Sequence, residues 1–312
     1  MPKENLEEKL KEVKQIKISD DTDILELVNG LKNSGFNAKR LAIACEIYKQ
    51  MVDDKDCVKF FGLAGALVPA GMQGIIYDFI KEGFIDILVT TGANLTHDLV
   101  EALGYHHLQG DINISNINDA DLRNEEINRI YDVFMPNRVY EGIEDFISKL
   151  TIPDNKMSVS SFLQFLGKQI PNTPRSILKI CSDMNVPIFC PAFTDSGLAL
   201  QLGFHHQKIN LNHFKDMLDM VNLAWDAKKA GVCIIGGGVP KNFIMQSLQF
   251  CPNSATYAIQ ITMDRPEPGG LSGATLKEAI SWGKVNENAE YSTVISDATI
   301  ALPLIFWYLK KS

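Results

Sequence analysis

The chain has 312 residues, 46% of them hydrophobic and 22% charged, a composition typical of a globular protein with a sizeable core. A net charge of -8 and a pI near 5.3 exclude a general electrostatic attraction to nucleic acid or to anionic membranes. No stretch reaches the roughly 18 apolar residues of a membrane span, and the first residues lack the apolar segment of a secretory signal.

The N-terminal segment, residues 1–54, is predicted to be helical. Leu6, Leu10, Val13 and Ile16 recur at helical spacing among Glu and Lys, which indicates an amphipathic helix packed on this chain or on a neighbouring subunit. One or two further helices are expected within residues 21–54. The remainder, 55–312, is expected to form a single α/β domain.

Six short apolar runs alternate with helix-like segments after residue 55. Continuous apolar strands alternating with helices predict a doubly wound, mostly parallel sheet of six or more strands, Rossmann-like, with helices on both faces. An Asn/Asp-rich region within 104–156 interrupts this rhythm and is interpreted as an insertion. The expected strands lie within 58–68, 84–94, 186–195, 231–241, 255–264 and 291–298.

Small and acidic residues follow several of these runs. In a parallel sheet, such turns meet at one edge, where exposed backbone N–H groups favour phosphate and carboxylates can bind ribose hydroxyls. Their recurrence predicts a dinucleotide site, although each turn alone is equally compatible with a tight turn or a helix N-cap. The candidate residues are Thr91, Gly92, Ala93, Asp195, Gly197, Gly237, Gly238, Asp297 and Ala298.

The cysteines and histidines give little sign of a metal site. The six cysteines form no CxxC pair, and Cys190 and Cys233 lie in apolar strand-like runs, which indicates buried thiols in a reducing cytoplasm. The histidines lack a metal-binding helical pair, so no metal is expected. His97 follows the turn at Thr91 closely and is a candidate acid or base near the cofactor.

Four segments resemble the deoxyhypusine synthase family in order and approximate spacing. They are LVTTGANLTHD (88–98), PAFTDSG (191–197), IGGGV (235–239) and SGATLKEAISWGK (272–284), and the last is long and specific. The resemblance extends over roughly residues 55–305. It implies the fold of that family, with 55–312 as an NAD-binding catalytic domain.

The resemblance also implies a reaction. Spermidine would be oxidised with NAD, and its aminobutyl group would pass through an imine on Lys284 to an acceptor lysine of a translation initiation factor 5A precursor. Glu278 and Trp282 match residues that line the polyamine channel, a carboxylate for an ammonium and an indole face for the methylenes. The family works as a homotetramer whose active sites are each shared between two subunits.

The chain departs from the family pattern around the polyamine. Leu200 and Leu271 stand where the family has carboxylates, Asn242 replaces a histidine thought to assist proton transfer, and Gln246 replaces an asparagine. Each lost charge-assisted hydrogen bond is worth about 1.5–3 kcal/mol. The chain is therefore interpreted as a divergent, synthase-like member with Asn242 and Gln246 in its substrate site.

Three functions remain open at this point. The first is deoxyhypusine synthesis proper. The second keeps the chemistry but uses a small-amine acceptor such as putrescine, as a homospermidine synthase does. The third is a catalytically inactive NAD-binding scaffold.

Overall fold

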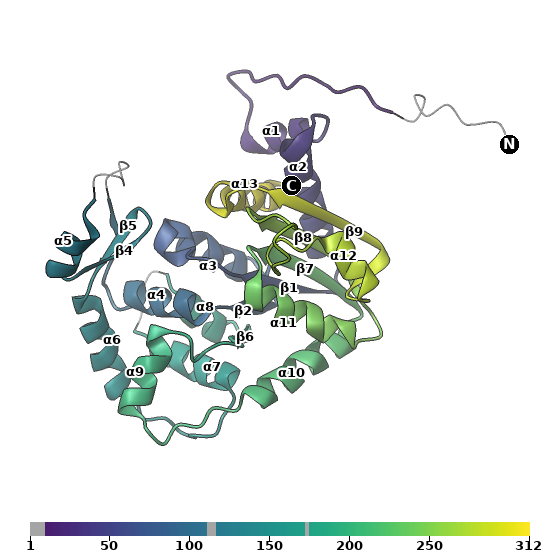
Figure 1. Ribbon diagram of the computed structural model, residues 1–312. Coiled ribbons are helices and arrows are strands. Elements are labelled where there is room, and N and C mark those ends of the chain that lie inside the picture. The colour runs from purple at the N-terminus through teal and green to yellow at the C-terminus, as the bar shows by residue number, and fades with distance from the viewer. Residues whose placement is uncertain (1–9, 111–116, 172–174) are drawn as a thin grey trace.

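The computed structural model describes residues 10–110, 117–171 and 175–312, and its central feature is a six-stranded sheet (Figure 1). The strand order is β6-β2-β1-β7-β8-β9, and every neighbouring pair is parallel. Each of the six predicted apolar runs overlaps one strand, so the doubly wound parallel sheet is confirmed. The strands are β1 (Cys57–Leu63), β2 (Ile87–Thr90), β6 (Ile188–Phe189), β7 (Lys229–Ile235), β8 (Ala255–Thr262) and β9 (Val285–Ile295).

Helices pack on both faces of the sheet, because successive residues of a strand point to opposite sides. Phe61 and Cys233 belong to one apolar core, whereas their chain neighbours Phe60 and Val232 belong to the other. The first core includes α2 (Phe36–Asp53), α3 (Gln73–Lys81), α4 (Gly92–Ala102), α7 (Val159–Gln169), α8 (Ile177–Asp183) and α13 (Ala298–Lys311). The second includes α10 (His213–Asp226), α11 (Gly238–Gln249) and α12 (Leu276–Ser281).

The strand order reverses direction once, between β1 and β7. From β1 the chain builds outward through β2 to β6, and from β7 it builds outward through β8 to β9 on the other side. The helices that follow β1 and β7 diverge at such a switch point and leave a crevice at the carboxyl ends of the two strands. Ligands of doubly wound proteins bind there.

The predicted N-terminal amphipathic helix is wrong for the residues that the structure describes. Residues 10–19 contain neither helix nor strand, and Leu10 and Val13 are 72% and 59% exposed. A short helix needs a surface on which to bury its apolar face, and residues 10–19 are all exposed on the described part of the chain. Leu6 lies outside the described residues. The helices expected within 21–54 are present as α1 (Ile24–Leu31) and α2.

A small antiparallel sheet lies at the periphery of the molecule, apart from the main sheet, within the region predicted as an insertion (Figure 1). It consists of β3 (Leu108–Gln109), β5 (Val133–Pro136) and β4 (Ile127–Ile130), accompanied by α5 (Asp119–Asn124) and α6 (Arg138–Ser148). Helix α9 (Gly197–His205) packs on α4 and α6. Part of the Asn/Asp-rich patch lies outside the described residues. None of the described helices is long and apolar enough to cross a bilayer.

Candidate active site

All the turns predicted to contact a dinucleotide lie at the carboxyl edge of the sheet, because its strands are parallel. Thr91, Gly92 and Ala93 follow β2, Asp195 and Gly197 follow β6, Gly237 and Gly238 follow β7, and Asp297 and Ala298 follow β9. The structure therefore brings these residues to one edge, although not to one point along it.

The crevice at the switch point adds two residues that the sequence analysis missed. Gly65 and Ala66 follow β1 and are exposed. Ala64, between them and the strand, lies next to Gly236 after β7, since a Cβ atom at Gly236 would be 3.4 Å from it. Gly65 and Gly238 have φ values of 83° and 57°, the left-handed region that glycine tolerates. A side chain added at Gly238 would meet no atom within 4 Å. Open backbone beside a helix N-terminus fits the pyrophosphate of NAD.

Gly237, unlike Gly238, is closely packed against another loop. A Cβ atom there would lie 2.3 Å from Cα of Ser272, so the turn after β7 packs directly on the loop that precedes α12. The Ser272 hydroxyl also accepts a hydrogen bond from the Gly238 backbone N–H, at 3.1 Å. The space next to Gly237 is therefore filled by Ser272, and Gly238 is the more open of the two predicted phosphate contacts.

Gly92 lies at the contact between two further turns of this edge. A Cβ atom at Gly92 would lie 2.5 Å from Cβ of Ser196, so the turn after β2 packs against the turn after β6. Thr91 caps α4 by accepting a hydrogen bond from the Asn94 backbone N–H. Ser196 caps α9 in the same way through Ala199, which leaves the neighbouring Asp195 outside the cap with an exposed side chain.

The two candidate ribose-binding carboxylates lie far apart within one chain. Asp195 follows β6 and Asp297 follows β9, and these are the two edge strands of the sheet. Five strand spacings separate β6 from β9, about 24 Å in all. Asp297 also caps α13, because its Oδ1 accepts hydrogen bonds from the backbone N–H and hydroxyl of Thr299.

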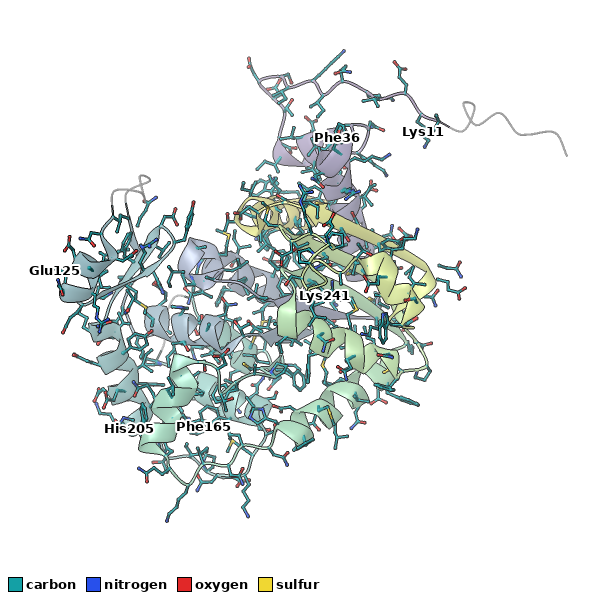
Figure 2. All side chains as sticks on the ribbon, viewed as in Figure 1. Lys11, Phe36, Glu125, Phe165, His205 and Lys241 are labelled. Carbon is teal, nitrogen blue, oxygen red and sulfur yellow. The ribbon has the colours of Figure 1, made fainter. Side chains whose placement is uncertain are left out.

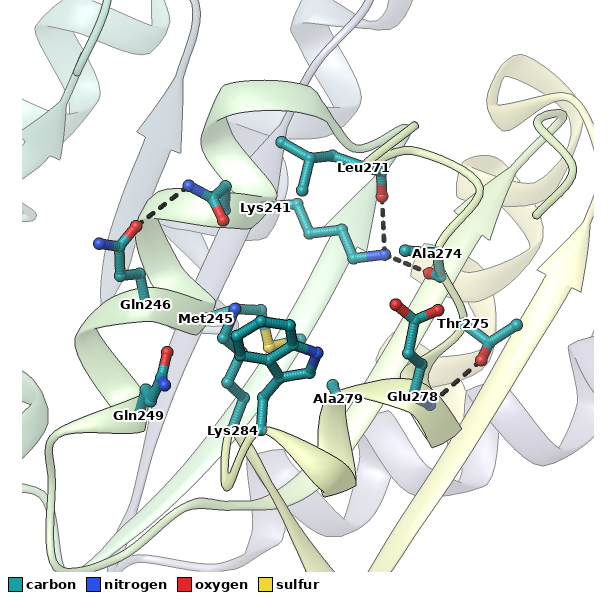
Figure 3. A pocket seen from close by; sticks show the side chains of 12 residues that line it. Lys241, Met245, Gln246, Gln249, Leu271, Ala274, Thr275, Glu278, Ala279 and Lys284 are labelled. Atoms are coloured by element: carbon teal, nitrogen blue, oxygen red, sulfur yellow. Dashed lines mark hydrogen bonds between the residues drawn. The ribbon is translucent and has the colours of Figure 1, made fainter. Parts of the chain in front are cut away.

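A pocket of about 390 Å³ lies between α11 and α12 (Figure 3). It contains all five residues that the sequence analysis assigned to catalysis and substrate binding, which come from segments up to 42 positions apart in the chain. The lining consists of Lys241, Asn242, Met245, Gln246, Gln249, Leu271, Ala274, Thr275, Glu278, Ala279, Trp282 and Lys284.

The local sequence directs Lys284 into this pocket. Helix α12 begins at Thr275, whose hydroxyl accepts from the Glu278 backbone N–H, and it ends at a left-handed Gly283 with φ of 69°. The Gly283 N–H donates to Ile280 and the Lys284 N–H to Ala279, the hydrogen-bond pattern of a Schellman motif. The resulting reversal turns the chain into β9 and places the Lys284 ammonium nitrogen 5.0 Å from the Trp282 ring centroid.

Lys241 is a second lysine of the pocket, and the sequence analysis did not single it out. Its side chain is only 5% exposed and donates to Gln260 Oε1 at 3.0 Å and to the carbonyls of Leu271 at 3.0 Å and Ala274 at 2.5 Å. Figure 2 shows Lys241 near the middle of the molecule as viewed. Burial lowers the pKa of Lys241 to about 8, an effect that nearby Glu278 opposes. Lys241 thus fastens the 271–274 loop to α11. Its position directly after the glycine-rich turn Gly-Gly-Gly-Val-Pro could have marked Lys241 as a candidate site residue from the sequence alone.

The two leucines that depart from the family pattern have different surroundings. Leu271 lines the pocket, and its carbonyl accepts from Lys241. Leu200 lies on α9, is 58% exposed, and is not part of the lining. Of the two leucine changes, therefore, the one at Leu271 alters the pocket within one chain, together with the changes at Asn242 and Gln246.

His97, on α4, belongs to a half-buried hydrogen-bonded cluster. Its Nδ1 lies 2.8 Å from Nε2 of His107, whose Nδ1 lies 2.6 Å from Oε1 of Glu101. Burial, followed by the neighbouring His107, lowers the pKa of His97 to about 4, so this ring stays neutral near pH 7. Among the described residues, no group of three or more side chains is arranged to hold a metal ion.

Comparison with known proteins identifies the family. The sequence profile described as deoxyhypusine synthase matches residues 26–309. The chain belongs to the deoxyhypusine synthase family. The match begins inside α1 and extends almost to the end of α13, so it includes both the carboxyl edge and the α11–α12 pocket.

Archaeal relatives are similar over nearly their whole length. "Probable deoxyhypusine synthase 1" of Methanosarcina acetivorans is 48% identical, covering 94% of this chain and 92% of the relative. The protein of the same name from Archaeoglobus fulgidus is 41% identical, at 92% and 93% coverage. "Probable deoxyhypusine synthase 2" of M. acetivorans is less similar, 38% identical at 90% and 85% coverage.

A solved structure supports the fold. The crystal structure of a candidate deoxyhypusine synthase from Entamoeba histolytica superposes with a TM-score of 0.65, covering 94% of this chain and 96% of that one. The two sequences are 19% identical. The likeness therefore concerns the fold, which matches the expectation drawn from the sequence motifs.

Proposed function

We propose that this member of a transferase family catalyses NAD-dependent transfer of the aminobutyl group of spermidine to an acceptor amine, through an imine on Lys284. The first acceptor to consider is the lysine of a translation initiation factor 5A precursor. The observation that carries the proposal is that Lys284, Glu278 and Trp282 line one pocket. This pocket lies beside the 271–274 loop, which Lys241 holds through hydrogen bonds.

The residues of the pocket have distinct roles in this chemistry. The carboxylate of Glu278 points into the pocket and can hold an ammonium group of the donor (Figure 3). The Trp282 ring supplies an apolar face for methylenes and attracts a cation. The amine of Lys284 adds to the carbon of the oxidised donor as the nucleophile. Asn242 and Gln246 offer neutral hydrogen-bonding groups to the rest of the donor.

NAD fits the carboxyl edge, where Gly65 and Gly238 leave backbone open at the switch point. Thr91 and Ala93 at the start of α4 and Asp297 at the start of α13 are the further proposed contacts. The bound cofactor would supply hydride-accepting and hydride-donating chemistry. The loop 271–274 joins the two parts of the site, since Ser272 packs on Gly237 while Leu271 lines the pocket.

We further propose a homotetramer whose active sites are shared between subunits. Asp195 and Asp297 lie at opposite edges of one sheet, so one cofactor can meet both carboxylates only if two chains contribute. Large apolar side chains on α9 and α10 are also exposed and suit burial against another copy. These are Leu200, Phe204, Phe214, Leu218 and Trp225. Light scattering of the purified chain gives the oligomeric state, and a monomer would contradict this proposal.

The test of function is trapping of the lysine adduct. The protein is incubated with NAD and labelled spermidine, reduced with borohydride, and analysed by peptide mass spectrometry. We expect an aminobutyl group on Lys284 and none in Lys284→Arg, which keeps the charge but cannot form the imine. Absence of an adduct from the wild-type protein, despite NAD binding, would refute the transferase and leave the inactive NAD-binding scaffold.

A small-amine acceptor is the second candidate. Leu271 and Asn242 stand where the family pattern has a carboxylate and a histidine, so the pocket has fewer ionisable groups, which favours a changed amine partner. Offering the factor precursor and putrescine in parallel to the trapped adduct distinguishes the two. Transfer to putrescine alone would identify a homospermidine synthase-like enzyme.

A further inference from the structure

Glu101, His107 and His97 form a hydrogen-bonded chain of side chains on and beside α4. Oε1 of Glu101 accepts the His107 backbone N–H at 2.9 Å and lies 2.6 Å from Nδ1 of the same residue. Nε2 of His107 lies 2.8 Å from Nδ1 of His97. The other oxygen of Glu101 lies 2.9 Å from Nδ1 of His106, whose side chain is 72% exposed. The His107 side chain is only 6% exposed, so its two ring nitrogens are held between Glu101 and His97.

This network assigns the protons on the ring nitrogens. Against the opposing effect of burial, hydrogen bonds from His107 and His106 hold the pKa of Glu101 at about 2, so the carboxylate is ionised near pH 7 and accepts from Nδ1–H of His107. A neutral His107 then has its lone pair at Nε2, which accepts from Nδ1–H of His97. His97 in turn has its lone pair at Nε2, and among the described residues none forms a hydrogen bond with that atom. The outer end of the chain is therefore a base.

Such a chain can take up a proton without leaving charge on its outer ring. When His97 binds a proton at Nε2, its Nδ1 proton can pass to Nε2 of His107. His97 is then neutral again, and the positive charge rests on His107 beside the ionised Glu101, where the two form an ion pair. Burial and the neighbouring His107 lower the pKa of His97 to about 4, so this ring alone resists a positive charge. We call the chain of Glu101, His107 and His97 the histidine relay.

The histidine relay lies close to the proposed cofactor contacts after β2. His97 is one helical turn beyond Ala93 on α4, so the two side chains share a face of that helix, and Ala93 is exposed. Thr96 Oγ1 accepts the Leu198 backbone N–H at 3.0 Å, which fastens α4 to the start of α9. Asp195 lies just before α9. His97 and Asp195 therefore belong to one packed unit at the carboxyl edge.

The α11–α12 pocket lies on the opposite face of the sheet. Helix α4 contributes to the first apolar core, whereas α11 and α12 contribute to the second, so the sheet separates His97 from Lys284 within one chain. In the homotetramer proposed above, Asp195 meets a cofactor that the partner's Asp297 also contacts, and His97 accompanies Asp195 to that site. Resting on the function proposed above, we propose that His97 accepts a proton from the amine donor bound in the pocket of a partner subunit.

The proton transfer balances with the reaction proposed for Lys284. A donor ammonium group gives one proton to His97 Nε2, and the neutral nitrogen can then share its lone pair with the neighbouring carbon. Hydride leaves that carbon for NAD, which gives an iminium and NADH. Lys284 adds to the iminium carbon and expels the remainder of the donor as a neutral amine, which takes up the proton that the relay held. His107 and Glu101 are the positioning residues, since they act through His97.

Three histidine variants test the relay through the single-turnover rate of Lys284 adduct formation from spermidine, trapped with borohydride. His97→Asn retains a donor group near His107 but removes Nε2. We expect its maximal rate to fall about a hundredfold, with unchanged half-saturating spermidine and an unchanged NAD dissociation constant. His107→Asn should also lower the maximal rate because it interrupts the relay, whereas His106→Asn, a change in the exposed ring, should not.

The contrary results of that experiment are distinct. A wild-type rate in His97→Asn, or a loss confined to NAD or spermidine affinity, would overturn the role of His97 as a proton acceptor. A full rate in His107→Asn would overturn the relay. Absence of any adduct from the wild-type protein would instead refute the function proposed above.

The tautomer of His97 gives a readout that needs neither cofactor nor activity. Nitrogen NMR of the labelled protein without NAD distinguishes a protonated from an unprotonated ring nitrogen. We expect His97 to carry its proton on Nδ1 and to lose that preference in His107→Asn. A wild-type His97 protonated at Nε2 would overturn the assignment of a base at the end of the relay.

Hybrid oligomers test whether His97 acts in the site of a partner. His97→Asn and Lys284→Arg chains with different tags are co-expressed, and oligomers that contain both tags are purified. The intact Lys284 of a His97→Asn chain can then meet the intact His97 of a Lys284→Arg chain. We expect rapid adduct formation on about half of the Lys284 residues in randomly mixed hybrids. Adduct formation as slow as in His97→Asn alone would overturn the contribution from the partner subunit.

Discussion

The ammonium nitrogen of Lys284 lies 5.0 Å from the centroid of the Trp282 ring, on the other side of a left-handed Gly283. The two side chains come from opposite ends of a tight helix-terminating turn, so their approach depends on the conformation of a single glycine. The indole face thereby lies beside Lys284, the proposed nucleophile, and also borders the proposed donor site.

Replacing Trp282 should weaken donor binding more than it affects folding, since the ring is 57% exposed. We expect Trp282→Leu to weaken donor binding by about 0.5–2 kcal/mol, because the apolar contact remains but the cation–π attraction is lost. Trp282→Phe should retain part of that attraction. Dissociation constants of the amine measured by calorimetry would distinguish the two variants, and equal losses would refute the aromatic contribution.

Lys241 should make stability depend on pH at the alkaline end. Its pKa is about 8 in the folded chain, below the ordinary value of 10.5, so the unfolded chain binds more protons between those values. The wild-type free energy of unfolding should therefore rise relative to Lys241→Met as pH increases from 8 to 10.5. Urea unfolding of both proteins at several pH values tests this, and parallel profiles would refute it.

Gly237 and Gly270 provide a matched pair around the loop that joins the two parts of the site. A methyl group at Gly237 would overlap Ser272, whereas one at Gly270 meets nothing within 4 Å. We expect Gly237→Ala to lower the unfolding free energy by about 1–3 kcal/mol and to weaken both NAD and amine binding. Gly270→Ala should be close to neutral. Thermal unfolding and binding titrations provide the measurements, and equal effects at both glycines would contradict the packing argument.

Glu101 should contribute to stability in mild acid. Burial raises the pKa of this carboxyl, but hydrogen bonds with His107 and His106 outweigh it and hold the pKa at about 2 instead of 4.5. A carboxyl whose pKa is lower in the folded chain than in the unfolded chain stabilises the fold above pH 4.5, and that contribution is lost as pH falls towards 2. Glu101→Gln should remove roughly 1–3 kcal/mol of it, after allowance for partial exposure, and flatten the profile between pH 5 and 3. Unchanged slopes in denaturant unfolding would refute this.

The sequence by itself determined the type of fold and five of the residues that line the α11–α12 pocket. Mostly apolar runs at β1, β7 and β8 require cover on both faces, which indicates a parallel sheet. The SGATLKEAISWGK segment carries Glu278, Trp282 and Lys284 at close spacing. Its prediction for the N-terminus was wrong in residues 10–19, because helical periodicity states which face would be buried but not whether a surface exists to bury it.

Only the tertiary structure decided the strand order, and several features of the site depend on it. The order places β1 beside β7, so the crevice opens at Gly65 and Gly238, and it sends Asp195 and Asp297 to opposite edges of the sheet. It also buries Lys241 against the 271–274 loop. Spacing along a chain reports local periodicity, whereas these contacts join segments tens to hundreds of residues apart, and packing of the whole sheet selects which of them meet.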